Sequence, residues 1–371
     1  MKYFIRTFGC KTNQYESELM KHLLKENGHQ VVSDYCDADV VVINSCAVTQ
    51  PAERDVYKFI RRVDRESKQT DRVLLIGCYA EYINQLNLYN DFFNRLNSKI
   101  NVEFFGNKDK YFFIDKKFTS CNIINCGIKK FYGEKRAYVK IQDGCNNFCS
   151  YCIVAYLRNE MLSKPLEVVL KEIEELLKNQ YYEIYLVGTN IGKYSYLHNG
   201  KKFDLVDLSE EILRNFDQVT IIFSSLEPPD LNEKFFDFLE KYRQRIFPHF
   251  HIPLQSADDE ILLDMNRKYS VSEYENKIIR IRNIMPEAII SSDVILGYPI
   301  ETKEKFLKTL NFIEKVKFNW VHVFPYSPRK GTLSYKKYGN FSCYDAKYRV
   351  RELNKLNEKL GEKFFKKLCK I

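Results

Sequence analysis

The residues Gly144-Cys145-Asn146-Asn147-Phe148-Cys149-Ser150-Tyr151-Cys152 follow an apolar stretch, Ala137–Ile141, that has the pattern of a buried strand. The spacing of their cysteines is C-x3-C-x2-C. Three thiolates on one short loop can hold three irons of a [4Fe–4S] cluster, which leaves the fourth iron open to a small-molecule ligand. Gly144 gives the backbone room to pass close to such a cluster. This stretch therefore predicts an iron–sulfur site at the end of a strand.

A zinc site is the alternative for these thiols. Cys121 and Cys126 lie upstream, and the eighteen residues between Cys126 and Cys145 are near the spacing of a zinc ribbon. That arrangement takes four ligands from five cysteines and ignores the strand that runs between them. The iron–sulfur site is the favoured interpretation.

The chain after this loop repeats a strand–helix pattern. Helical periodicity separates five further apolar stretches, which are Glu183–Val187, Val219–Phe223, His249–Leu254, Ile289–Leu296 and Trp320–Phe324. Together with Ala137–Ile141 they predict a partial (β/α)6 TIM-like barrel over residues 136–345. Its functional loops are expected at the carboxyl ends of the strands.

The first part of the chain predicts an α/β domain over residues 1–115. Strands at Lys2–Phe8, Val40–Asn44 and Val73–Gly77 alternate with helices at Gln14–Glu26 and near Ala52–Val63. Strands this apolar are typical of a parallel sheet covered on both faces.

A cysteine follows each of these three strands: Cys10, Cys46 and Cys78. The carboxyl ends of parallel strands meet at one edge of a sheet, so the three thiols can meet in space. Three unrelated buried thiols are the alternative. The matching positions favour a second metal site.

Two further segments complete the predicted organisation. Residues 100–135 are irregular, basic and aromatic, and 116–135 are expected to connect the two domains. Residues 346–371 predict a basic helix, with nine Lys or Arg against three Glu from Lys347 onward. Such a helix is consistent with nucleic-acid binding and also with a solvated charged face.

Composition places the protein in the cytoplasm, without a membrane partner. Apolar residues make up 45% of the 371 residues, and 58 Lys and Arg against 49 Asp and Glu give a net charge of +9. No apolar run is long enough to span a bilayer, and Arg6 interrupts the N-terminus too early for a secretory signal. In a reducing compartment, eleven cysteines indicate metal binding rather than disulfides.

The cysteine motif, with an aromatic residue before its last cysteine, resembles that of the radical S-adenosylmethionine superfamily. The resemblance implies that the open iron binds S-adenosylmethionine, which one electron cleaves to methionine and a 5′-deoxyadenosyl radical. Tyr151 would contact the adenine. Gly188, Thr189 and Asn190 would hold the methionine end, with further contacts from Ser225, Gln255 and Arg158.

The landmarks together are similar to those of the radical S-adenosylmethionine methylthiotransferases (the MiaB, MtaB and RimO proteins). The matching segments are Gly9–Ser17, Val42–Thr49, Gly77–Ala80, Leu186–Asn190, Ser224–Pro228, His251–Ser256 and His322–Arg329. The resemblance implies two [4Fe–4S] clusters. One is held by Cys10, Cys46 and Cys78, and the catalytic one is held by Cys145, Cys149 and Cys152.

The residues after the first cysteine, Lys11 and Thr12, resemble the MtaB group most. That group modifies N6-threonylcarbamoyladenosine at position 37 of tRNA, next to the anticodon. The family mechanism implies methylation of a sulfur at the second cluster and removal of hydrogen from adenine C2 by the radical. The expected partners are tRNA and a reducing electron donor such as flavodoxin or ferredoxin.

The chain departs from the family pattern at several positions. Leu162 and Ile222 replace arginines and Ile300 replaces a glycine, and the basic tail is expected to stand in place of the strand-rich, RNA-gripping TRAM domain of the family. Two lost guanidiniums remove bidentate partners for phosphate or carboxylate. Isopentenyladenosine in tRNA and a protein residue therefore stay open as substrates, as does an inactive paralogue that binds RNA or protein. Five cysteines have no assigned role: Cys36, Cys121, Cys126, Cys343 and Cys369.

Overall fold

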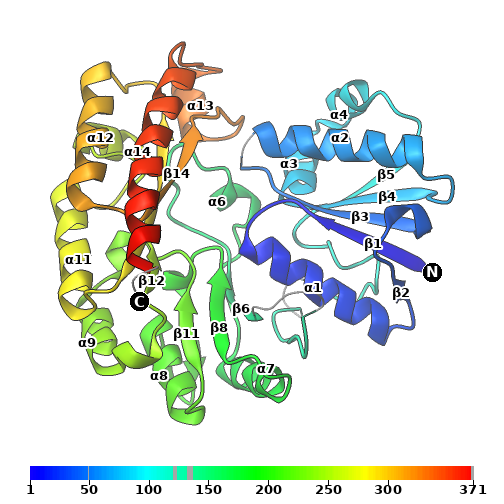
Figure 1. Cartoon of the computed structure of the whole chain (residues 1–371). Helices are drawn as coiled ribbons and strands as arrows, with labels where there is room; N and C mark the ends of the chain where they lie inside the picture. The colour runs from blue at the N-terminus through cyan, green and yellow to red at the C-terminus, as the bar shows by residue number, and fades with distance from the viewer. Residues whose placement is uncertain (49, 120–122, 132–136, 369–371) are drawn as a thin grey trace. The chain divides into compact units, whose positions relative to one another are not determined.

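The computed structural model of the chain describes residues 1–48, 50–119, 123–131 and 137–368, and the side chains of the last helix as far as Gly361. The chain divides into two compact units (Figure 1). The first unit contains Met1–Asn146, Ile153–Thr189 and Tyr196–Gly200. The second contains Asn147–Cys152, Asn190–Ser195 and Lys201–Ile371.

A five-stranded sheet forms the start of the first unit. Its order is β2-β1-β3-β4-β5, and every neighbouring pair is parallel. The strands are β1 (Lys2–Thr7), β2 (Gln30–Val31), β3 (Val40–Ser45), β4 (Arg72–Gly77) and β5 (Asn101–Phe105). Figure 1 shows α1 (Lys11–Glu26) on one face of the sheet, and α2 (Gln50–Glu66), α3 (Cys78–Leu86) and α4 (Tyr89–Leu96) on the other. The short 3-10 helix η1 (Tyr35–Asp37) precedes β3.

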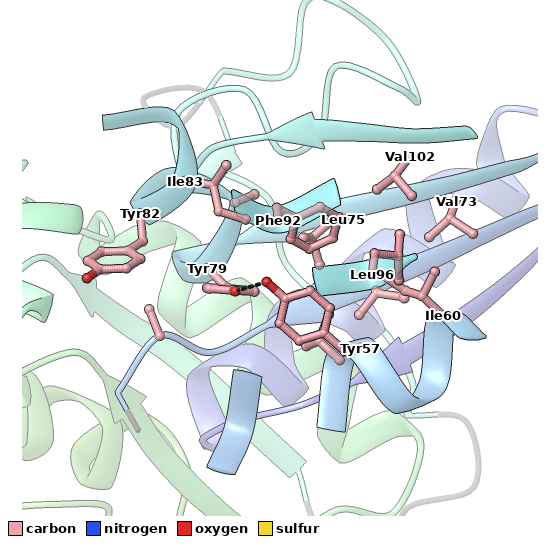
Figure 2. Close-up of a cluster of buried hydrophobic side chains, with 14 of the residues drawn as sticks. Tyr57, Ile60, Val73, Leu75, Tyr79, Tyr82, Ile83, Phe92, Leu96 and Val102 are labelled. Atoms are coloured by element: carbon pink, nitrogen blue, oxygen red, sulfur yellow. Dashed lines mark hydrogen bonds between the residues drawn. The ribbon is translucent and has the colours of Figure 1, made fainter. Parts of the chain in front are cut away.

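A hydrophobic cluster of this sheet lies under α2, α3 and α4. Every residue of β3 is buried, as a run of valine and isoleucine in a central strand requires. Figure 2 shows Tyr57 and Tyr79 joined by a hydrogen bond of 2.9 Å between their hydroxyls, next to the ring of Phe92. That bond satisfies two buried hydroxyl groups inside an apolar cluster.

The strand β5 corrects one expectation. Its residues begin the segment predicted to be irregular, yet they pair in parallel with β4 from Arg72↔Asn101 to Ile76↔Phe105. Only one of its five residues is fully buried, so the sequence lacks the apolar run that marks β3 and β4. The strand β5 therefore forms because it pairs with β4, and its local sequence pattern does not determine it.

The first unit continues with β6 (Ala137–Asp143), β7 (Leu162–Ser163), β8 (Glu183–Gly188) and β9 (Tyr196–His198), and with α6 (Val154–Leu157) and α7 (Leu166–Lys178). Strand β6 pairs in parallel with β8 and antiparallel with β7. The predicted apolar stripe of α7 is buried at Leu166, Val169, Ile173 and Leu176. The Leu162 that replaces an arginine of the family pattern lies in β7.

The second unit contains a parallel sheet in the order β12-β13-β14. The strands of the second unit are β10 (Lys201–Phe203), β11 (Thr220–Phe223), β12 (His249–His251), β13 (Ile289–Leu296) and β14 (Trp320–Pro325), of which the last three form this sheet. Its helices are η2 (Ile191–Lys193), α8 (Leu205–Asn215), η3 (Pro228–Asp230), α9 (Glu233–Tyr242), η4 (Arg243–Arg245), α10 (Asp259–Asp264), α11 (Val271–Ile284), α12 (Lys303–Val316), α13 (Leu333–Tyr338) and α14 (Ala346–Leu368).

All six strands predicted after residue 136 are present as β6, β8, β11, β12, β13 and β14. Strand β12 ends at His251, earlier than the predicted Leu254. Beyond it, Gln255 forms an isolated parallel bridge with Val294. Among the helices that the structure describes, none has the length and apolar character that a membrane span requires.

Candidate cluster sites

The cysteines after the first strands lie at one edge of the N-terminal sheet. Cys10 is the N-cap of α1, Cys46 follows β3 directly, and Cys78 is the first residue of α3. The strands that precede them, β1, β3 and β4, are neighbours in the sheet. A Cβ atom built on Gly9 would lie 3.1 Å from Cβ of Cys46. Burial, with the nearby Cys78 and Cys10 thiols, raises the pKa of Cys46 to about 12. The structure thus brings the three thiols together.

Two asparagines hold the loops that carry these cysteines. The amide of Asn13 donates to the carbonyl of Phe8 at 3.3 Å and to that of Ser45 at 3.2 Å. The amide of Asn44 donates to the carbonyl of Asn13 at 3.0 Å. These bonds join the residues beside Cys10 to those beside Cys46, so the two loops are fixed relative to each other.

A buried arginine lies against the third cysteine. Nε of Arg158 is 3.2 Å from Sγ of Cys78. The same guanidinium binds Glu16 through both of its terminal nitrogens, at 2.8 and 3.1 Å, and Asp143 at 2.8 Å. Arg158 was predicted as an S-adenosylmethionine contact, and these are the partners that the structure gives it.

Two lysines complete this buried charge network. Lys110 and Lys140 lie 2.7 and 2.6 Å from Glu16. Burial opposes ionisation of Glu16 and Asp143, but Arg158 and the lysines hold the pKa of both carboxyls well below its ordinary value. Burial lowers the pKa of Lys110 to about 8. Three cationic groups against two carboxylates leave surplus positive charge beside Cys78.

The loop of the C-x3-C-x2-C motif begins at the end of β6. Gly144 has φ of +87°, and a Cβ atom there would lie 2.0 Å from the carbonyl oxygen of Glu160, so only glycine fits. The amide of Cys145 donates to the carbonyl of Arg158 at 3.1 Å. The first cysteine of the motif is therefore anchored to the backbone of the segment that carries the arginine.

The other two cysteines of the motif belong to the second unit. Nη1 of Arg267 lies 3.2 Å from Sγ of the buried Cys149, and Arg267 also pairs with Glu227. The amide of Cys152 donates to the carbonyl of Cys149 at 2.9 Å. A cavity of about 80 Å³ lies beside Cys149, lined among others by Lys193, Glu227 and Arg267. A cation thus faces a motif thiol here, as Arg158 faces Cys78.

The remaining predicted contacts are distributed over several elements. Half-buried Tyr151 packs against the apolar cluster of Ile261, Met265 and Tyr298. Gly188 ends β8, and the hydroxyl of Thr189 donates to Asp143 at 2.8 Å. In the second unit, Asn190 is buried at the start of η2. The backbone of Ser225 forms an isolated parallel β-bridge with that of His251 in the same unit. Gln255 has a left-handed φ of +67°.

The thiols present fit iron–sulfur ligation. None of the nine cysteines that the structure describes forms a disulfide, so no disulfide withholds the six predicted ligands from a metal. Cys121, needed for the alternative zinc site, lies outside the described residues, as does Cys369. The carbonyl of Cys126 accepts from Lys164 at 3.0 Å.

Sequence reasoning missed the charged residues that surround the thiols, namely Glu16, Lys110, Lys140, Asp143 and Arg267. Glu16 is part of a segment quoted for its family resemblance, but nothing local marks it as the centre of a network whose partner Arg158 is 142 residues away. Arg267 belongs to none of the quoted motifs. Long-range ion pairs of this kind have no signal in a single sequence.

Comparison with known proteins gives two family matches. Residues 2–92 match the family described as "Uncharacterized protein family UPF0004", and residues 139–313 match the radical SAM superfamily. A tRNA-2-methylthio-N(6)-dimethylallyladenosine synthase from Thermodesulfovibrio yellowstonii is 32% identical over 98% of this chain and 85% of its own length. The chain belongs to the tRNA methylthiotransferase family.

A second relative of this family is a threonylcarbamoyladenosine tRNA methylthiotransferase MtaB from Thermotoga maritima. It is 33% identical over 88% of this chain and 75% of its own length. Membership makes the chain a radical S-adenosylmethionine transferase, with S-adenosylmethionine and [4Fe–4S] clusters as cofactors.

A solved structure supports the fold. The radical S-adenosylmethionine methyltransferase TsrM from Kitasatospora setae superposes with a TM-score of 0.60 at 12% identity, over 90% of this chain and 77% of that one. The predicted fold class, an N-terminal parallel α/β sheet followed by a partial barrel of the radical S-adenosylmethionine type, is confirmed.

Proposed function

We propose that this methylthiotransferase adds a methylthio group to C2 of N6-threonylcarbamoyladenosine at position 37 of tRNA, next to the anticodon. The proposal rests on the segment after the first cysteine, where Lys11 and Thr12 resemble the group that modifies this nucleoside. Lys11 begins α1 directly after Cys10, and Thr12 is buried. The two residues that carry the resemblance thus adjoin a thiol of the N-terminal cysteine site.

The six cysteines divide into two ligand sets in this proposal. Cys10, Cys46 and Cys78 hold one cluster, and Cys145, Cys149 and Cys152 hold the other. The matched families, at 2–92 and 139–313, fall within the proposed domains 1–115 and 136–345, with 116–135 as the connection and 346–371 as the basic C-terminal helix. When bound, the cofactors supply the radical and sulfur-transfer chemistry, and the protein positions them and excludes water.

Around S-adenosylmethionine, the proposed contacts are Tyr151, Gly188, Thr189, Asn190, Ser225 and Gln255, with Arg158 acting through its neighbours. Tyr151 offers a ring to the adenine from an apolar cluster. The hydroxyl of Thr189 is oriented by its bond to Asp143, which Arg158 also binds. A low-potential donor such as flavodoxin or ferredoxin would supply the electron.

A second candidate substrate is dimethylallyladenosine in tRNA. It is supported by the relative from Thermodesulfovibrio yellowstonii, a synthase for the methylthio form of that nucleoside. The two relatives differ by one percentage point in identity to this chain, so overall similarity does not separate the substrates.

Mass spectrometry of the nucleosides in bulk tRNA tests the proposal. We expect a strain that lacks this gene to lose the methylthio form of threonylcarbamoyladenosine and to accumulate the unmodified nucleoside. Re-expression of the wild-type chain should restore it. Re-expression of a variant with Cys145, Cys149 and Cys152 changed to Ala should not, because the radical step needs that cluster.

Each other outcome points to a different function. Loss of methylthio-dimethylallyladenosine instead would replace the first substrate by the second. An unchanged nucleoside profile would contradict both and leave a protein substrate or an inactive RNA-binding paralogue. Cleavage of S-adenosylmethionine by the purified protein separates those two.

A further inference from the structure

Three of the chain's six histidines lie on one sheet of the second unit, on β12 and β14. The side chains of His249 and His251, of Ser291 and Asp293, and of Trp320 and His322 each stand two residues apart on their strands. Residues two apart on a strand point to the same face. In the parallel register Asp293 lies opposite His322, and His251 lies opposite Ser291. The sheet therefore gathers imidazoles and a carboxylate on one face.

The distances within this group suit a metal ion. Ligand atoms of His251, Asp293 and His322 all lie within 4.8 Å of one another, and among the described residues no other group of three or more His, Cys, Asp or Glu does so. Nε2 of His251 is 3.2 Å from a carboxylate oxygen of Asp293. The side chains of His251 and Asp293 are 16% and 25% exposed, so both donors are sheltered without being closed off.

The surroundings orient the donors. The hydroxyl of Ser291 lies 3.0 Å from Nδ1 of His251 and 3.0 Å from Nε2 of His249. The hydrogen bond at Nδ1 leaves Nε2 of His251 directed at Asp293. In histidines that bind metal, a hydrogen bond at the other ring nitrogen orients the ring in the same way. His251 is the one titratable side chain within ion-pair distance of the Asp293 carboxylate in the described part of the chain. No permanent cation there offsets the charge of this sheltered carboxylate.

We propose that His251, Asp293 and His322 bind one divalent zinc ion. Two imidazoles and one carboxylate are a ligand set that such ions prefer, and three protein ligands leave a position open for water or a substrate oxygen. The two cysteine sites assign no role to these residues, although His251 and His322 begin two of the segments that carry the family resemblance.

One contact must change when the metal binds. The indole of Trp320 donates to Nδ1 of His322 at 3.3 Å, a long hydrogen bond. Ligation of the metal through Nε2 of His322 requires the proton on Nδ1. Nδ1 can then no longer accept a hydrogen bond, so the bond from the Trp320 indole must break. Trp320 is 47% exposed and has room to turn. It is also the only tryptophan of the chain, so its fluorescence reports on this site.

The test uses the full-length chain with its clusters reconstituted under anaerobic conditions. The protein is dialysed against Zn²⁺, and zinc and iron are measured in the same sample, because unchanged iron shows that zinc has not entered the cysteine sites. We expect one zinc per chain and a change in Trp320 emission. In His251→Ala and in Asp293→Asn, zinc affinity should fall by about tenfold or more.

Two controls keep the result interpretable. His198→Ala removes a histidine outside the group and should bind zinc as the wild type does. Asp293→Asn keeps the size of the side chain, and its iron content shows that the protein is folded. Wild-type protein that binds no zinc would overturn the proposal, and so would His251→Ala and Asp293→Asn variants that bind it with unchanged affinity.

Discussion

Single charged residues connect the cysteine loops of the first unit to its interior. Arg158 contacts Cys78, Glu16 and Asp143 at once and is almost fully buried. Burying this many charges costs desolvation energy, which is recovered only while every partner is present. The network therefore makes the position of Cys78 depend on one guanidinium.

Replacing that guanidinium gives a prediction at this scale. Arg158→Gln removes the buried guanidinium that binds both Glu16 and Asp143, so the free energy of unfolding should fall by about 3–5 kcal/mol. Arg158→Lys keeps the positive charge but loses the bidentate geometry of the guanidinium. Its free energy of unfolding should lie between those of Arg158→Gln and the wild type. Urea unfolding followed by circular dichroism measures both.

Lys108→Gln is the matched control, since Lys108 pairs with Glu160 while 66% exposed. Its effect should stay within about 0.5 kcal/mol. Equal stability of Arg158→Gln and Lys108→Gln would show that the buried network does not hold this region.

The sequence allows some residues of the candidate sites to be predicted and not others. The cysteines could be predicted because spacing in a loop and position after a strand are local properties. The role of Arg158 could not be predicted, because its partners Glu16, Asp143 and Cys78 lie on different helices and strands. The grouping of His251, Asp293 and His322 depends on strand register, which no single strand specifies.

At the scale of elements, the last helix both supports the barrel sheet and presents charge. Strand β14 is at the edge of its sheet, and the side chain of Asn357 in α14 bonds both the amide and the carbonyl of Val321, at 3.1 and 2.6 Å. An edge strand is thereby covered. Arg349 of the same helix is buried against Glu301, so part of the predicted basic tail is structural.

Asn357→Ala should loosen this helix from β14. It leaves two buried backbone groups of Val321 without partners, at a cost of about 1–3 kcal/mol each. Asn354→Ala, at an exposed position of the same helix, should cost less than about 0.5 kcal/mol. Thermal unfolding of the two variants side by side measures the difference, and equal midpoints would contradict the proposed clamp.

The exposed face of α14 gives a prediction about RNA. Lys347, Arg351, Lys355 and Lys359 are exposed and recur every four residues, so they form one basic stripe. Cations on phosphates release counterions, which makes binding strong at low salt and weak at high salt. Reversing all four to Glu should weaken tRNA binding steeply, as measured by filter binding across a salt series.

The charge-matched control reverses Arg54, Lys58, Arg65 and Lys68, exposed basic residues in or just after α2. Cleavage of S-adenosylmethionine without RNA should survive in both variants. If the α14 variant binds tRNA as well as the control does, the stripe is only a solvated face.

At the scale of the whole molecule, the order of elements was the most predictable property. Six strands of the second series occur where apolar runs predicted them, and β6, β8 and β11 are mostly buried, as such runs require. The division into units was less accessible to prediction. It separates Cys145 from Cys149 and Cys152, although all three belong to one short loop. Contacts between distant segments decide such boundaries, and a linear pattern does not contain them.

The iron content of the reconstituted protein tests the central claim, that six cysteines hold two clusters, most directly. The account predicts roughly eight irons per chain, four for each cubane cluster. Changing Cys10, Cys46 and Cys78 to Ala should leave about half of the iron, and changing Cys145, Cys149 and Cys152 should leave the other half. A wild-type chain that holds a single zinc and no iron, or a triple variant that keeps all of its iron, would contradict it.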